Sequence, residues 1–222
     1  MSAGEIAEIT GLTLRVALVA TLVGIPPAVG LAWLLARREF RGRSLVQACI
    51  ALPMVLPPVA VGVGLLLLLG RRGPLAPLLA ALGVELVFSW GAAALAAAVV
   101  GFPLLVRACQ QSFAEIDPRT ERLARSLGLG PVATFFRVSL PLARRGVLYG
   151  SLLAFTRALG EFGATAVVAG IIPGRTETLA LGIWSRVQRG DDAGALLLCA
   201  ASFALALASL WAAEGWLGRR PR

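Results

Sequence analysis

The sequence predicts an all-α protein that crosses a membrane five times and forms one transmembrane domain over residues 1 to 222. Hydrophobic residues make up 58% of the chain, and the mean hydropathy is +0.82. Five apolar runs are long enough for a transmembrane helix, which needs about 20 residues to cross a hydrocarbon core of about 30 Å. The charged residues lie mainly between these runs. We therefore expect a multi-pass protein of a lipid bilayer.

The first two predicted spans contain internal prolines. The first covers residues 12 to 36, where Pro26 and Pro27 should kink the helix. The second covers residues 45 to 69, and its prolines are Pro53, Pro57 and Pro58. Because a proline within a span frees backbone carbonyls, neighbouring helices, water or a cavity must satisfy them. We expect the second span to lie in the protein interior beside a path, with a merely bent helix as the alternative.

Three further spans are predicted at residues 86 to 106, 146 to 172 and 193 to 216. Trp90 should anchor the third span at a membrane interface. The fourth begins with small residues spaced four apart: Gly146, Gly150, Ala154 and Ala158. Such a ridge lets helix backbones approach closely in lipid, so it favours a tight interface between helices.

The basic residues predict the topology. All 21 are arginines. Fourteen follow the first span, lie within residues 107 to 145 or lie at the C-terminus, whereas five lie on the opposite side. Because positive loops stay in the cytoplasm, we expect the N-terminus outside and the C-terminus inside a cytoplasmic (inner) membrane. The net charge of +9 therefore reflects topology, and no nucleic-acid partner is predicted.

Missing residue types exclude several functions. Without lysine the chain cannot contain the phosphate-binding loop G-x-x-x-x-G-K-[ST], so it is not its own ATPase. Without histidine it lacks the commonest metal ligand and general base. Its cysteines lie singly in apolar stretches: Cys49, Cys109 and Cys199. We expect no metal site, no cofactor and no catalytic residue.

Residues 107 to 145 interrupt the apolar runs and predict a cytoplasmic helix-turn-helix. Asp117 can cap a helix whose first residue is Pro118. That helix should run to about Leu127, because Gly128 can supply the left-handed residue that ends it. We expect its apolar residues to share one face, with charged residues toward the other side. The apolar set is Leu123, Ala124 and Leu127, and the charged set is Glu121, Arg122 and Arg125.

A second short helix is expected after this turn, from residue 132 to 138. Pro141 should then push Leu140 out of helical geometry, because proline disfavours the helical conformation in the residue before it.

The spacing of Glu121, Ala124, Gly128 and Pro141 resembles the EAA loop of ATP-binding-cassette importer permeases. In that family the loop forms a coupling helix that docks into a cleft on a cytosolic ATPase. The resemblance implies these ATPase-coupling residues: Glu121, Leu123, Ala124, Ser126, Leu127, Gly128 and Pro141. An ordinary amphipathic surface helix between two spans is the alternative.

The fourth predicted span carries charge near the middle of the bilayer. Arg157 at that depth costs about 2.5 to 3.5 kcal/mol, so it needs a partner or a wet cavity. Glu161 lies one turn further on and is within reach as an i,i+4 partner. In one interpretation this pair neutralises itself and locks the fold. In the other, Arg157 lines the path of an anion together with Thr156 and Thr165.

A more specific resemblance covers nearly the whole chain, from Leu12 to Trp216. The segments RALGEFGAT and IPGRTETL, which begin at Arg157 and Ile172, are similar to the molybdate permease family. The segments ALPMVLPPVAVGVG, GRRG and FSW in and after the second span also match. Sulfate and tungstate permeases share much of this pattern, so tungstate or sulfate is the alternative cargo.

This resemblance implies a binding-protein-dependent permease fold and the membrane subunit of an ATP-driven oxyanion importer. It also implies a homodimer, two copies of a cytosolic ATP-binding subunit and an extracytoplasmic oxyanion-binding protein. The translocation path would include Thr156, Arg157, Glu161, Thr165, Pro57 and Pro58. Residues 176 to 187 would contact the binding protein or lie as a helix in the membrane interface.

Three other classes of function are alternatives to the importer. A passive channel would explain the polar fourth span but not the cytoplasmic helix-turn-helix. A membrane scaffold subunit would explain docking but not Arg157 in the membrane. An intramembrane enzyme would need a nucleophile, base or metal cluster, which the sequence does not offer.

Overall fold

The computed structural model describes residues 1–217. The three C-terminal arginines that were used to predict the topology (Arg219, Arg220 and Arg222) lie outside the described residues. The described chain folds into helices, as predicted. In order, they are α1 (Ala3–Arg37), α2 (Arg43–Val55), α3 (Pro58–Leu69), α4 (Ala76–Ala81), α5 (Trp90–Ala114), α6 (Pro118–Ser126), α7 (Pro131–Thr134), the π-helical turn η1 (Phe135–Ser139), α8 (Leu140–Leu159), α9 (Gly163–Val168), α10 (Leu179–Gln188) and α11 (Asp192–Leu217).

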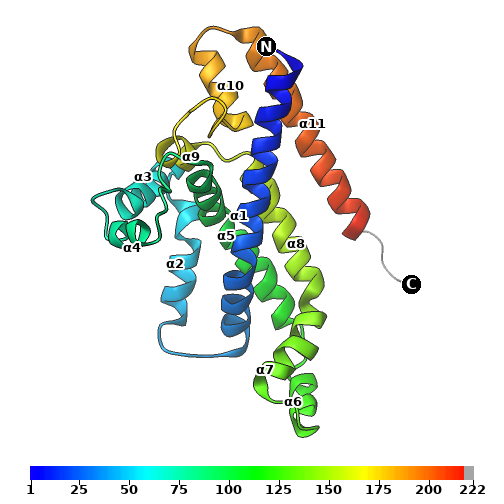
Figure 1. Ribbon diagram of the computed structural model, residues 1–222. Coiled ribbons are helices and arrows are strands. Elements are labelled where there is room, and N and C mark those ends of the chain that lie inside the picture. Colours follow the sequence, from blue (N-terminus) through cyan, green and yellow to red (C-terminus); the bar gives the residue numbers. More distant parts are fainter. Residues whose placement is uncertain (218–222) are drawn as a thin grey trace.

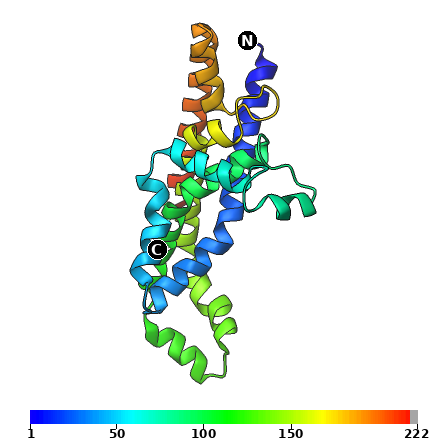
Figure 2. The ribbon, with the colours of Figure 1, turned by 90° about the vertical axis from the view of Figure 1, so that its left-hand side faces the viewer.

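The molecule is elongated, and its two ends are made by different helices (Figures 1 and 2). The N-terminus, α10 and the start of α11 lie at one end, whereas α6 and α7 lie at the other. Between them α1, α5 and α8 pack side by side. Residues of α5 contribute to two large buried clusters, one on each half of its length. By length and composition, α1, α5 and most of α11 can each cross a membrane, and α2 with α3 can form a fourth, broken span.

Helix α1 begins well before the predicted start at residue 12. Ser2 and Glu5 form a capping box, in which each side chain bonds the other residue's backbone N–H. Pro26 and Pro27 are accommodated inside the helix without ending it. With 35 residues, α1 is about 52 Å long, which exceeds the thickness of a hydrocarbon core by about 20 Å. One part of α1 must therefore project from the bilayer.

The predicted second span is broken rather than merely bent. Helices α2 and α3 meet at an angle of 113°. Leu56 is extended because a proline follows it, and Pro57 continues the extended backbone with ψ 133° before Pro58 starts α3. Two consecutive prolines therefore break the predicted single helix into two and change the direction of the chain.

The predicted fourth span is also two helices. Helix α8 ends at Leu159, and the short α9 follows after Gly160, Glu161 and Phe162. Helix α9 packs against α3, so the second halves of the predicted second and fourth spans meet each other. Their backbones approach closely at two glycines: a side chain on Gly62 would collide with Ala164, and one on Gly163 would collide with Pro58.

The predicted helix-turn-helix forms, but its second part differs. Gly128 takes the left-handed conformation with φ +92°, as expected for the end of α6. Leu140, however, stays helical, so the predicted break before Pro141 is wrong. The π-helical turn shifts the backbone pairing so that Leu140 N–H donates to the carbonyl of Phe135. This longer turn lets the chain pass from α7 into α8 without a break.

The ridge of small residues on α8 is used inside the chain. A side chain on Gly146 would collide with Ser112 of α5, and one on Gly150 would lie 2.9 Å from the Cβ atom of Ala108. The predicted tight interface is therefore the packing of α8 against α5. Because these small residues face α5 of the same chain, the ridge gives no support to a homodimer.

Candidate functional site

The end of the molecule formed by α6 and α7 exposes apolar side chains. Leu123 is 65% exposed and Leu127 is 84% exposed. Val132 and Phe136, which follow the turn at Gly128, are also largely exposed. We call these four residues the apolar tip. An exposed apolar cluster on a charged helix end is typical of a docking surface for another protein.

The predicted faces of α6 are wrong in one respect. Ala124 is buried while its predicted neighbours Leu123 and Leu127 point outward. Glu121, expected on the charged and solvated side, is only 5% exposed. The helix therefore turns its small residue and its carboxylate inward, and it turns its leucines toward solvent. Ser126, another predicted coupling residue, donates from its hydroxyl to the carbonyl of Leu123 within α6.

Glu121 is buried because the end of α1 provides its partner. Arg37 Nε lies 2.9 Å from Glu121 Oε1, and the hydroxyl of Ser139 donates to the same oxygen at 2.7 Å. This contact does not follow from local sequence patterns. Its two charges lie 84 positions apart, and no periodic pattern links residues at such a separation.

A second cluster of polar residues lies at the junction between α8 and α9. Arg157 Nη1 lies 2.9 Å from Glu161 Oε2, so the predicted i,i+4 pair forms. The other carboxylate oxygen of Glu161 accepts the backbone N–H of Ala164 at 2.9 Å. Glu161 thus pairs with the last turn of α8 and caps the first turn of α9. Its side chain is 2% exposed, whereas that of Arg157 is 35% exposed.

The other predicted path residues take different positions. Thr165 is buried within α9, and the hydroxyl of Thr156 donates to carbonyls of its own helix. Pro58 contacts the backbone at Gly163, while Pro57 forms the exposed corner between α2 and α3. The structure therefore brings Arg157, Glu161 and the α3–α9 contact to one region, but Thr165 does not face an open surface.

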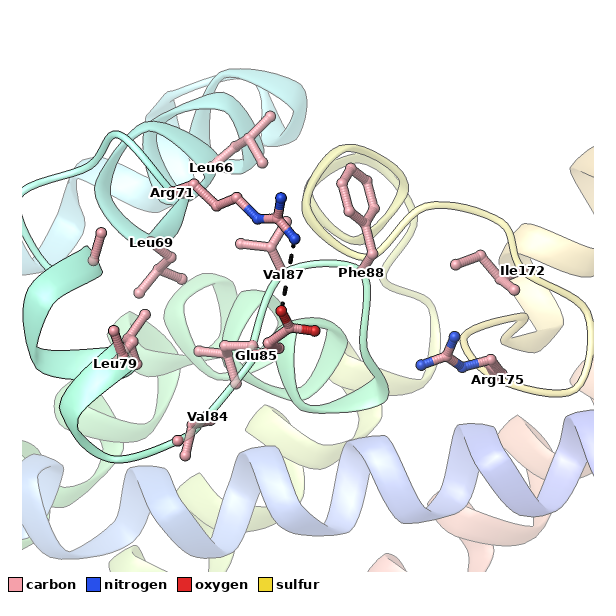
Figure 3. Close-up of a pocket in the computed structure, with 15 residues that line it drawn as sticks. Leu66, Leu69, Arg71, Leu79, Val84, Glu85, Val87, Phe88, Ile172 and Arg175 are labelled. Atoms are coloured by element: carbon pink, nitrogen blue, oxygen red, sulfur yellow. Dashed lines mark ion pairs between the residues drawn. The ribbon is translucent and has the colours of Figure 1, made fainter.

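A cavity of about 880 Å³ lies between α3, α4 and the loop that follows α9 (Figure 3). Its walls are mostly apolar. At its rim Arg71 and Glu85 form an exposed ion pair at 3.7 Å, and Arg175 lies on the other side of the opening. Phe88 lines the cavity with an unusual positive φ of 58°, held by its N–H bond to the carbonyl of Val168. The segments GRRG and FSW contribute residues to its lining, but a cavity was not predicted from them.

Helix α10 overlaps the predicted segment of residues 176 to 187, and its apolar residues differ in exposure. Leu179 is fully buried, whereas Trp184 and Val187 are about half exposed. The helix is tied to α1, because Thr13 Oγ1 accepts the N–H of Leu179 at 2.8 Å. A buried ion pair at 2.8 Å, between Glu177 and Arg186, stabilises the turn into α10. This end of the molecule is thus a packed unit.

Comparison with known proteins identifies the family. The model of the family described as "Binding-protein-dependent transport system inner membrane component" matches residues 28–222. The "Molybdenum transport system permease protein ModB" of Escherichia coli (strain K12) is 44% identical over 213 residues, which cover 95% of this chain and 93% of that protein. The "Sulfate transport system permease protein CysW" of Synechococcus elongatus is 38% identical over 174 residues, or 78% of this chain and 61% of that protein.

Solved structures share the fold at low sequence identity. A chain of a bacterial ABC transporter that imports the acidic polysaccharide alginate has a TM-score of 0.77 and 16% identity, covering 100% of this chain and 82% of that chain. A chain of the MetNI methionine ABC transporter in an inward-facing conformation has a TM-score of 0.69 and 16% identity, with 100% of both chains covered. These likenesses support the fold alone.

Proposed function

This chain belongs to the family of binding-protein-dependent inner membrane transport components, and from that membership we propose that it imports molybdate or a closely related oxyanion. It is a multi-pass membrane protein and the permease subunit of an ABC importer. ATP hydrolysis belongs to a separate subunit in such systems, and a substrate-binding protein delivers the cargo.

The apolar tip carries the proposal of ATP-driven transport. Leu123 and Leu127 are exposed on a helix that is itself held in place by a buried carboxylate. Exposed leucines at the end of a membrane protein are unfavourable in water, so a partner that covers them gains apolar contact area. We propose that two copies of the cytosolic ATP-binding subunit dock on this tip in a homodimer of the chain.

Transport would then follow from movement of the tip. Closure of the ATPase pair would displace α6, and the packed helices α1, α5 and α8 would transmit that displacement to the broken spans. Such a movement is a shift between two packings of the same helices. The junctions between α2 and α3 and between α8 and α9 are the places where the spans have no continuous helix to resist it.

The choice of oxyanion rests on the relatives. Identity and coverage are both higher for the molybdenum permease of Escherichia coli than for the sulfate permease of Synechococcus elongatus. Molybdate is therefore the first candidate, and sulfate and tungstate are the competitors.

The test is ATP hydrolysis by the chain reconstituted in lipid with its candidate ATP-binding subunit and binding protein. We expect molybdate to stimulate hydrolysis more than tungstate or sulfate. Stimulation by sulfate alone would identify sulfate, instead of molybdate, as the cargo. If an intact complex responds to none of the three anions, the proposal of an oxyanion importer is wrong. A chain that never retains an ATP-binding subunit on gentle purification would instead favour a channel or a scaffold.

A pair of variants tests the docking surface within the same system. Leu127→Glu places a charge on the apolar tip, and we expect loss of the ATP-binding subunit with normal membrane insertion. Phe40→Glu makes the same change on another exposed apolar residue, in the loop between α1 and α2. It should retain the subunit. Normal retention by Leu127→Glu would contradict docking at the tip.

A further inference from the structure

We infer that Arg37 is a positioning residue, which holds the coupling helix α6 to the first span, and that Glu121 acts within this chain rather than on the ATPase. This inference rests on the proposed function, because it concerns how movement of α6 reaches the membrane. It is carried by one buried network at the junction of α1, α6 and η1.

The network is formed by two charged groups and two neutral ones. Arg37 Nε donates to Glu121 Oε1 at 2.9 Å, and Arg37 Nη2 donates to the carbonyl of Ile116 at 3.1 Å. The hydroxyl of Ser139 donates to the same carboxylate oxygen at 2.7 Å. The two charged side chains are 11% and 7% exposed. A single carboxylate of α6 thus receives donors from the last residue of α1 and from the last residue of η1.

This geometry fixes the orientation of α6 relative to the end of α1. The planar guanidinium presents its donors at fixed angles, so bonds to Glu121 and Ile116 together define its orientation. Breaking the pair would leave a buried charge without a partner, and an unpaired buried charge is strongly destabilising. Rotation of α6 must therefore carry the end of α1 with it.

Another ion pair near this end of the molecule lacks these properties. Arg43 and Glu39 are 4.0 Å apart, and the side chain of Glu39 is almost fully exposed. Water and salt screen such a pair, so it transmits little force. Arg37 is distinguished by burial and by its two acceptors on the coupling segment.

The burial of Glu121 also separates two roles of α6, which are binding of the ATP-binding subunit and transmission of its movement. On α6 and its end, the apolar side chains available to a docking protein are Leu123 and Leu127, whereas Glu121 faces the interior. We therefore expect binding of the ATP-binding subunit to depend on the leucines. Transmission of its movement should depend on the ion pair between Arg37 and Glu121.

The test compares variants of the reconstituted complex by two readouts: retention of the ATP-binding subunit and molybdate uptake per ATP hydrolysed. Arg37→Met keeps an unbranched apolar stem but removes the charge and the hydrogen-bond donors of the guanidinium. We expect it to retain the subunit while uptake per ATP falls about tenfold or more, a typical size for coupling between sites. Arg37→Lys, which keeps the charge, should recover part of this loss.

The matched control is Arg41→Met, because Arg41 is exposed in the loop that follows α1. It should behave as the unmodified chain. If Arg37→Met folds poorly, the double variant Arg37→Met with Glu121→Met replaces the buried pair by apolar groups, an exchange that proteins often tolerate. That variant should be stable, retain the subunit and still be uncoupled.

Three results would overturn the inference. They are a normal uptake ratio in Arg37→Met, loss of the ATP-binding subunit from a stable Arg37→Met chain, and normal coupling in the double variant. Failure of the proposed function is a different result, because the unmodified chain itself would then show no hydrolysis stimulated by molybdate, tungstate or sulfate.

Discussion

Among single residues, Glu161 makes two structural contacts with one carboxylate. One oxygen pairs with Arg157 and the other caps α9 through Ala164. Because it satisfies a membrane arginine and the start of a broken helix together, the structural interpretation of this pair is the better supported one. Arg157 nevertheless keeps a third of its side chain exposed, so it can still present charge to a path.

Substitutions at Glu161 should separate these two contributions. Glu161→Ala removes both, and we expect it to lower the unfolding free energy by about 2 to 3 kcal/mol. Glu161→Gln keeps an oxygen for the N–H of Ala164 and should cost about half as much. The measurement is equilibrium unfolding of the purified chain in detergent micelles. Glu115→Ala, at an exposed position, is the control and should change stability by less than about 0.5 kcal/mol. Equal stability of all three variants would contradict the double role.

Arg157→Ala distinguishes the two interpretations of the arginine itself. If Arg157 is structural, the variant should show a lower yield or a lower thermal midpoint, because Glu161 is left buried without its counter-ion. If instead the variant is stable and retains the ATP-binding subunit but loses uptake, Arg157 lines the path. Uptake into proteoliposomes and thermal unfolding should be measured on the same preparation.

Local sequence rules predicted some residues and could not predict others. The left-handed Gly128 and the Arg157–Glu161 pair follow from turn chemistry and i,i+4 spacing, and both are present. The burial of Glu121 could not be predicted in this way. Its environment is set by Arg37 of a distant helix, so the amphipathic pattern of α6 gave the wrong side for the carboxylate.

At the scale of elements, α3 and α9 depend on close backbone contact. Gly62 faces Ala164 and Val167 at distances that leave no space for a side chain, whereas Gly64 has open space around it. Prolines suggested a distorted second span, but they did not fix its angle. At the bend of 113° between α2 and α3, helix α3 packs against α9. Helix α9 forms where the predicted fourth span is interrupted.

The two glycines provide a matched pair of substitutions. Gly62→Ala would place its Cβ atom 2.7 Å from the carbonyl oxygen of Ala164. The helices must then separate, and we expect a loss of about 1 to 3 kcal/mol in unfolding free energy. Gly64→Ala adds the same atom in open space, so it should be neutral or slightly stabilising through helix propensity. The two variants are compared by thermal unfolding, and a Gly62→Ala chain as stable as Gly64→Ala would argue against the packing of α3 on α9.

At the scale of the whole molecule, the length of α1 defines how the protein sits in the bilayer. If Arg37 marks the cytoplasmic boundary, a hydrocarbon core of about 30 Å reaches roughly 20 residues back along the helix, to about residue 17. Arg15, stacked over Trp90 at 3.9 Å, then lies at the outer boundary, where such a pair is favourable. The remaining turns of α1 project outside together with α10, which packs against them (Figure 1).

This depth and orientation predict a pattern of cysteine labelling in a chain from which Cys49, Cys109 and Cys199 have been removed by substitution to Ala. A membrane-impermeant maleimide should modify Ala7→Cys in cells with a permeabilised outer barrier but an intact inner membrane. It should reach Arg125→Cys only after the membrane is disrupted, because α6 lies at the opposite end of the molecule. Leu22→Cys, which is exposed on the middle of α1, should react in neither condition because lipid covers it. Labelling of position 125 before position 7 would reverse the topology and place the apolar tip out of reach of a cytosolic ATPase. Free labelling of position 22 would instead show that α1 crosses the bilayer at another depth, so Arg15 and Trp90 could not mark its outer boundary.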